Sequence, residues 1–150
     1  GWGTWRDGWE HFNQDGQYLL DELKRGELIH AFDFNSTYSF SEMLQGQIKG
    51  DNDSWAVRWY ASTFLADKLT LYPGRSLVHN IGNDCSGTHS VESAVLDAKL
   101  SDTPINLSNI DIEPSPKGRQ VFEAFFRQNQ SGLLGRLASK IRASLKVGWR

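Results

Sequence analysis

Residues 50–59 contain the first group of side chains that could carry out a reaction. Asp53 lies two positions before Trp55 and about one helical turn before Arg58. A carboxylate can act as a general base, a tryptophan ring can stack on the C–H face of a sugar, and an arginine can hold a phosphate or a carboxylate. The structural alternative is that Asp53 or Asn52 caps the following helix and that the tryptophans belong to the core.

A polar loop over residues 82–90 is the second candidate. Its glycines would let backbone amides wrap around phosphate oxygens, and His89 could bind a divalent metal or donate to a diphosphate. A histidine in a loop is also often simply solvated. Cys85 is the single cysteine, and it has no evident base partner, which argues against a cysteine nucleophile.

Helical spacing predicts several elements around these groups. Trp2, Trp5 and Trp9 would lie along one side of a helix. Further helices are expected over residues 15–29, from a cap at Ser39 or Ser41 to about residue 49, over 53–67 and over 117–128. In the last of these, the sequence predicts buried side chains at four positions, namely Val121, Phe122, Phe125 and Phe126.

Short apolar runs predict strands between the helices. Residues 69–72 end at a Pro-Gly pair, residues 76–81 form a second run, and residues 105–112 could alternate as an edge strand. The expected fold is therefore mixed α/β, with helices packed on a short sheet.

Length, composition and charge exclude several classes of protein. The chain has 150 residues, 39% of them hydrophobic, which suits one globular domain and excludes a disordered chain. A net charge of −2 gives no global positive field, so no nucleic acid is expected as a partner. No apolar run approaches the ~20 residues that span a bilayer.

The end of the chain differs from the rest in charge. No acidic residue follows Glu123, and residues 133–147 form an amphipathic pattern with basic side chains beside an apolar stripe. Residues 131–150 could thus lie on an anionic membrane surface or bind a partner. The alternative is an ordinary surface helix that packs on the domain.

Several short motifs occur together in a fixed order. They are WGTWRDGW at residues 2–9, DSWAVRWY at 53–60, LYP at 71–73, SLV at 76–78, NIG at 80–82 and SGTH at 86–89. Together they resemble the C-terminal half of family two glycosyltransferases with the GT-A fold, which are bacterial enzymes of surface-polysaccharide assembly. The resemblance covers roughly residues 1–90.

The resemblance implies transfer of a sugar from a nucleotide-sugar donor to an acceptor hydroxyl, with inversion. Asp53 would be the base that deprotonates the acceptor. Trp2 and Trp55 would line the acceptor pocket, and Arg58 would contact substrate.

The resemblance also implies a donor side. Gly87 and Thr88 would lie on a loop that orders over the donor, and His89 would bind a divalent metal, Mn²⁺ or Mg²⁺. Most of the metal site would belong to a Rossmann-like nucleotide-binding half that precedes this chain, which begins abruptly in aromatic-rich sequence. We therefore expect these 150 residues alone to be inactive.

The resulting picture has two parts. Residues 1–116 would be the acceptor-side half of a GT-A domain, and residues 117–150 a basic helical tail. The expected partners are a nucleotide-sugar and a glycan or lipid-linked acceptor, and the expected location is cytoplasmic or peripheral at the inner face of the cell membrane. The alternative is a non-catalytic module that binds carbohydrate or a membrane surface.

Overall fold

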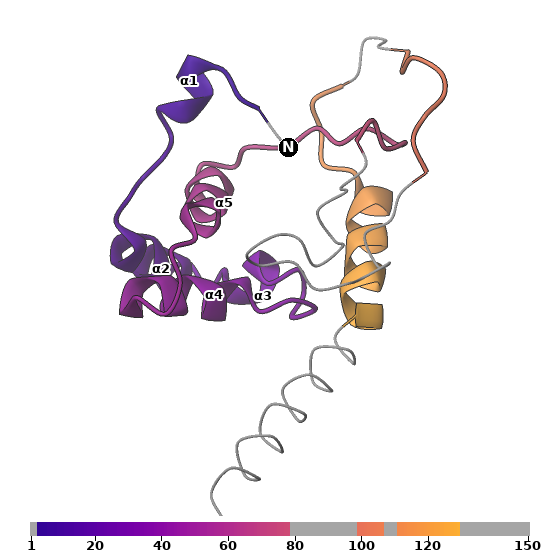
Figure 1. Cartoon of the computed structure of the whole chain (residues 1–150). Coiled ribbons are helices and arrows are strands. Elements are labelled where there is room, and N and C mark those ends of the chain that lie inside the picture. The colour runs from indigo at the N-terminus through magenta and orange to yellow at the C-terminus, as the bar shows by residue number, and fades with distance from the viewer. Residues whose placement is uncertain (1–2, 79–98, 107–110, 130–150) are drawn as a thin grey trace, which may run out of the picture. The chain divides into compact units, whose positions relative to one another are not determined.

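The computed structural model describes residues 3–78, 99–106 and 111–129 (Figure 1). Five helices are labelled along the first part of the chain, and a further helix runs over residues 116–129. The labelled helices are α1 (Arg6–Trp9), α2 (Gly16–Arg25), α3 (Ile29–Phe32), α4 (Phe40–Lys49) and α5 (Trp55–Leu65).

Helix α2 is specified by its own sequence. The Asp15 side chain accepts a hydrogen bond from the backbone N–H of Tyr18 at 3.0 Å, which satisfies a donor that the first turn leaves without a partner. The helix buries Leu19, Leu20 and Leu23 on one side. It therefore needs a partner surface for that side, and α4 and α5 provide it.

The core lies among α2, α3, α4 and α5. Its buried hydrophobic members are Leu19, Leu20, Leu23, Phe32, Leu44, Val57 and Ala61. Burial of a side chain of this size typically stabilises a fold by about 1.5–3 kcal/mol. Burial of these side chains against one another therefore holds the four helices together.

Helix α4 begins at a cap that lies outside its own sequence. Ser39 precedes the helix but makes no side-chain cap bond. Instead the buried Asp33 carboxylate accepts from the backbone N–H of Ser41 at 2.7 Å and from its hydroxyl at 2.6 Å. The helix ends at Gly50, where φ is +82°, a conformation that glycine adopts without strain.

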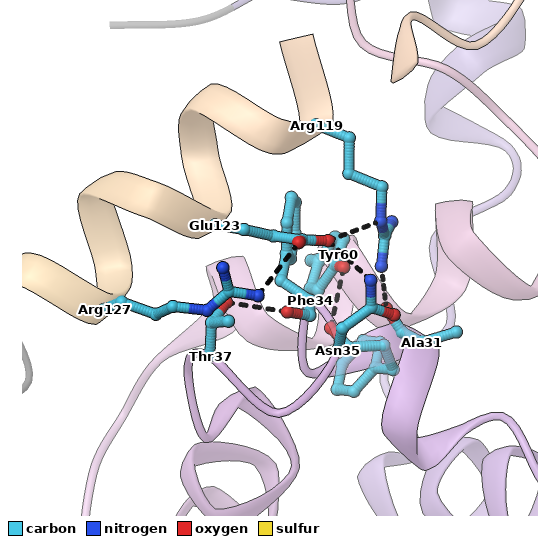
Figure 2. A network of polar contacts seen from close by, with 9 residues as sticks. Ala31, Phe34, Asn35, Thr37, Tyr60, Arg119, Glu123 and Arg127 are labelled. Atoms are coloured by element: carbon cyan, nitrogen blue, oxygen red, sulfur yellow. Dashed lines mark hydrogen bonds and ion pairs between the residues drawn. The ribbon is translucent and has the colours of Figure 1, made fainter. Parts of the chain in front are cut away.

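The turn after α3 has an unusual backbone. Phe34, Asn35 and Ser36 all have positive φ, between 49° and 58°, and such values are costly for residues with a side chain. The 116–129 helix packs on this turn, where the Asn35 amide donates to the buried Glu123 carboxylate at 2.7 Å (Figure 2). Arg119 donates to the same carboxylate at 3.1 Å and to the carbonyl oxygen of Ala31 at 2.9 Å.

Aromatic rings complete this contact. Phe126 lies 5.4 Å from the Phe34 ring and 4.9 Å from the Tyr38 ring, and the Arg119 guanidinium lies 4.9 Å above Phe34. The prediction that Val121 and Phe125 are buried is wrong, since 63% and 36% of them are exposed. The helix turns Glu123 inward instead, because that carboxylate satisfies donors that the strained turn and the arginine present.

The predicted α/β fold is contradicted, because the described residues are helical and contain no β-strand. The predicted partial GT-A fold with its short mixed sheet is therefore wrong for the described residues, whereas the resemblance of the motifs to the glycosyltransferase family stays a prediction. Residues 69–72 have no regular secondary structure and pair with no strand in the described part, where a single parallel bridge joins Ser76 to Leu100. An alternating apolar pattern becomes a strand only when a neighbour pairs along its length, and Leu71 and Tyr72 remain largely exposed.

The chain divides into two compact units. One comprises Gly1–Leu69 and Glu113–Arg150, and the other Thr70–Ile112. All five labelled helices belong to the first unit. The proposed division at residue 116 stays a prediction.

Candidate functional site

Asp53 is not the cap of α5. Ser54 is the cap, and its hydroxyl accepts from the backbone N–H of Val57 at 3.4 Å. Asn52 supports this turn, since its side-chain oxygen accepts from the N–H of Ser54 at 3.0 Å and its amide donates to the carbonyl oxygen of Met43 at 3.1 Å. Asp53 is exposed, and within the described part of the chain its carboxylate makes no hydrogen bond or ion pair. It is therefore available for chemistry in a way that Asn52 and Ser54 are not.

Trp55, at the start of α5, adjoins a cluster of aromatic rings. Trp9 stacks on Phe12 with centroids 4.9 Å apart and on Trp59 with centroids 5.0 Å apart, and it meets Trp55 edge-on at 6.1 Å. We call these four residues the tryptophan cluster. Trp9 and Trp55 are 44% and 45% exposed, so the cluster is a surface feature rather than part of the core.

The two rings that stack on Trp9 share one of its faces. Rings on opposite faces would be separated by at least two contact distances of about 3.5 Å each. The centroids of Phe12 and Trp59 are only 6.4 Å apart. Phe12 and Trp59 therefore support the indole of Trp9 from the same side.

Arg58 holds the segment that precedes α2. Its Nη1 donates to the carbonyl oxygen of Gln14 at 3.0 Å, and its guanidinium carbon lies 5.9 Å from the centre of the Phe12 ring. Its Nε is buried and has no hydrogen-bond partner in the described structure. One turn later, the Ser62 hydroxyl accepts from the N–H of Asn13 at 3.0 Å. Both side chains fix the preceding segment against α5, which the sequence did not predict; the expected contact of Arg58 with substrate stays a prediction.

The structure thus places Asp53, Trp55 and Arg58 on one short stretch at the beginning of α5. Sequence reasoning included Trp59 in the candidate group at residues 50–59 but assigned no role at the site to Trp9 or Phe12. The spacing of Trp9 and Phe12, three positions apart, and of Trp55 and Trp59, four apart, was the available signal, because such pairs meet on a helical turn.

Several predicted site residues lie outside the described residues. These are Trp2, Gly87, Thr88, His89 and the proposed membrane-binding segment 131–150. In the described ranges, no group of three or more His, Cys, Asp or Glu side chains could hold a metal ion. In the same ranges, no helix combines the length and apolar character needed to cross a membrane.

Comparison with known proteins returns no relative. No protein-family model matches the chain, and neither a curated protein nor a solved structure matches it.

Proposed function

We propose that this chain provides the acceptor side of an inverting glycosyltransferase that uses a nucleotide-sugar donor. The resemblance in the ordered motifs at residues 2–9, 53–60 and 71–89 supports the reaction class. The assignment of Asp53 as the base rests on its position and on the exposure of its side chain. It lies directly before α5, it is exposed, and Ser54 rather than Asp53 performs the capping.

In the proposed reaction Asp53 acts as the general base. Asp53 takes the proton from an acceptor hydroxyl while the hydroxyl oxygen attacks the anomeric carbon of the donor. The bond from that carbon to the nucleoside diphosphate breaks, and the diphosphate leaves with the bonding electrons. Attack from the face opposite the leaving group inverts the configuration of the sugar.

The proposal includes a divalent metal, Mn²⁺ or Mg²⁺, only as an expectation from the resemblance. The described residues do not supply a set of ligands for it, and His89 lies outside them. We therefore derive no step through the metal. Gly87 and Thr88 likewise remain proposed donor contacts, and Trp2 a proposed acceptor contact.

The test measures release of nucleoside diphosphate by the full-length protein. A panel of nucleotide-sugars is assayed with Mn²⁺, with Mg²⁺ and with EDTA, for the wild type, Asp53→Asn and Asp51→Asn. Loss of a general base should lower turnover by about 10²–10⁴-fold. Asp51→Asn is the matched control, because Asp51 is an exposed acid in the same loop. If Asp53→Asn turns over as fast as Asp51→Asn, Asp53 is not the base.

A second candidate function is a non-catalytic carbohydrate-binding module. The observation in its favour is the exposure of the tryptophans, which reaches 85% at Trp5. Such a module would bind glycans but release no diphosphate from any donor in the panel. Equal losses of binding and turnover in Asp53→Asn would point to a structural role of Asp53.

We also propose that the protein works in the cytoplasm, at the inner face of the cell membrane, through basic residues 131–150. The proposal rests on their sequence, which has no acidic side chain. Binding to anionic vesicles but not to neutral ones, lost on deletion of residues 131–150, is the expected result. Unchanged binding after the deletion would refute the role of this segment.

A further inference from the structure

The contact between the 116–129 helix and the turn after α3 is narrow. Within this helix only Glu123 is buried, whereas Val121 on the outer side is 63% exposed. The helix reaches the turn through side chains at spacings of three, four and seven, which lie along one side of a helix. They are Arg119, Phe122, Glu123 and Phe126.

The surface that receives this helix combines aromatic rings with polar groups. We call it the docking surface, and it consists of Ala31, Phe34, Asn35, Tyr38 and Phe40. The centroid of the Phe126 ring lies 4.9–5.9 Å from the centroids of its three rings. The Asn35 amide donates to Glu123, and the carbonyl oxygen of Ala31 accepts from Arg119 (Figure 2). The docking surface thus recognises aromatic rings, an acceptor and a donor at a fixed spacing on a helix.

The 116–129 helix is stabilised by its own sequence. The Ser115 hydroxyl accepts from the N–H of Gly118 at 3.1 Å, as an N-cap does, and Pro116 occupies the first helical position. Glu123 pairs with the arginines four residues before and after it, at 3.1 Å and 3.4 Å. The helix therefore has local support that does not depend on the docking surface.

The hydrophobic core does not include this helix. Among the described residues, the buried cluster and the apolar side chains packed against it all lie within residues 19–65. Residues 70–112, which separate the core from the helix in the sequence, form a compact unit of their own. Release of the helix would therefore leave the packing of the core in place.

The docking surface contains backbone strain. Phe34, Asn35 and Ser36 all have φ in the left-handed region, which is unfavourable for residues with a Cβ atom. The helix holds two of them, through the Arg119 guanidinium above the Phe34 ring and the Glu123 carboxylate at the Asn35 amide. Strained residues of this kind cluster at ligand clamps and switch regions. The strain opposes the docked state and so brings the docked and released states closer in free energy.

We propose that the 116–129 helix is a releasable cover of the docking surface, and that a helix of a partner protein binds there in its place. The partner helix carries Arg, Phe, Glu and Phe at positions i, i+3, i+4 and i+7, because the covering helix shows that this pattern fits. The covering helix competes at the high effective concentration that a tether gives, so the partner gains access when the cover is weakened. The inference does not depend on the proposed function, because neither Asp53 nor Trp55 belongs to the docking surface.

The experiment uses the full-length protein and a fluorescein-labelled peptide with the sequence of residues 113–129 as the partner helix. Fluorescence anisotropy measures binding to the wild type, to Glu123→Ala, and to Glu123→Ala combined with Asn35→Gly. Glycine at position 35 removes the amide and adopts a positive φ without strain. Glu123→Ala combined with Ser39→Ala is the matched control, because Ser39 is exposed in the same connection and makes no cap bond.

Two variant peptides test the partner side of the contact. One carries Glu123→Ala, which removes the acceptor for Asn35. The other carries Val121→Thr on the outer side of the helix, as a control of similar shape. Arg119→Ala in the protein weakens the cover by a second route, through loss of the bond to the carbonyl oxygen of Ala31, and circular dichroism checks that each protein variant is folded.

The expected result is saturable binding that increases when the cover is weakened. Loss of the buried acceptor in the cover should make the peptide bind Glu123→Ala about 5–150-fold more tightly than the wild type, and Arg119→Ala should act in the same direction. The Glu123→Ala peptide and the Asn35→Gly protein should each lose at least about fivefold in affinity. The Val121→Thr peptide and the Ser39→Ala protein should bind unchanged.

Three results would overturn the inference. The first is equal binding of the peptide to the wild type and to the variants with a weakened cover. The second is equal binding of the original and the Glu123→Ala peptides, or no effect of Asn35→Gly. The third is dimerisation of the wild type that rises with concentration and is abolished by Asn35→Gly, which would assign the docking surface to the helix of a second copy.

Discussion

In the core of α2, α4 and α5 the buried side chains are almost all aliphatic, whereas the 116–129 helix meets the turn after α3 through a buried glutamate and several aromatic rings. Leu23 and Leu44 in the core are fully buried. Glu123, at the other contact, is 7% exposed and accepts hydrogen bonds from Asn35, Arg119 and Arg127. The first region depends on apolar volume, and the second on polar partners that must all be present together.

The largest expected effect comes from the core. Leu44→Ala removes a fully buried side chain and leaves a cavity, which should lower the free energy of unfolding by about 2–5 kcal/mol. Chemical denaturation measures this loss. Leu69→Ala is the control, because Leu69 is 48% exposed and should change stability by at most ~0.5 kcal/mol. Equal effects of the two substitutions would mean that Leu44 does not belong to a packed core.

Removal of Glu123 should destabilise the contact between the 116–129 helix and the turn after α3, and leave the core of α2, α4 and α5 intact. Glu123→Ala leaves the Asn35 amide and the Arg119 guanidinium without their acceptor, at a cost of about 1–3 kcal/mol. Amide hydrogen exchange should rise in residues 31–37 and 116–129 and change little in α2. Glu113→Gln, at an exposed acid before the same helix, is the control. Uniform loss of protection throughout α2 would show that the two regions are one cooperative unit.

The smallest expected effect is an increase in stability from a substitution at Glu27. After α2 the chain reverses at Glu27, where φ is +55° and the N–H of Leu28 reaches the carbonyl oxygen of Leu23 at 2.8 Å. Glycine is the usual residue at this position of a helix end. Glu27→Gly should therefore raise stability by up to about 1 kcal/mol, measured as the midpoint of urea unfolding. A loss of stability would indicate that the Glu27 side chain has a role of its own.

Local sequence predicted three of the four core helices, namely α2, α4 and α5, to within a few residues of their bounds, and it did not predict α3. The expected end of a helix at about residue 49 matches the end of α4 at Lys49, because the spacing and cap chemistry that mark such an end lie within a few residues. The cap of α4 did not follow, because the acceptor is Asp33, eight residues before Ser41. A bond between residues brought together by a turn has no signal in local periodicity.

The other wrong predictions also arose because the deciding partner is distant in the sequence. Glu123 is buried because Asn35, 88 residues away along the chain, supplies a donor for it, whereas hydrophobicity alone placed Val121 and Phe125 inside. The apolar run at residues 69–72 became no strand, because pairing depends on a partner that no local pattern reveals. For the site, sequence identified Asp53, Trp55 and Arg58, but the support of Trp9 by Phe12 and Trp59 required the structure.

The Asp33 carboxylate has a consequence for the order of folding. Because it holds the N–H and hydroxyl of Ser41, α4 gains its first-turn partner only once the end of α3 has formed. The segments that form the core all lie within residues 16–65, and shorter loops between contacting segments favour faster folding. The contact of the 116–129 helix must close a much longer loop, so its entropic cost is higher. We therefore expect the four core helices, α2 to α5, to assemble early. The helix that carries Glu123 would then dock onto a surface that has already formed.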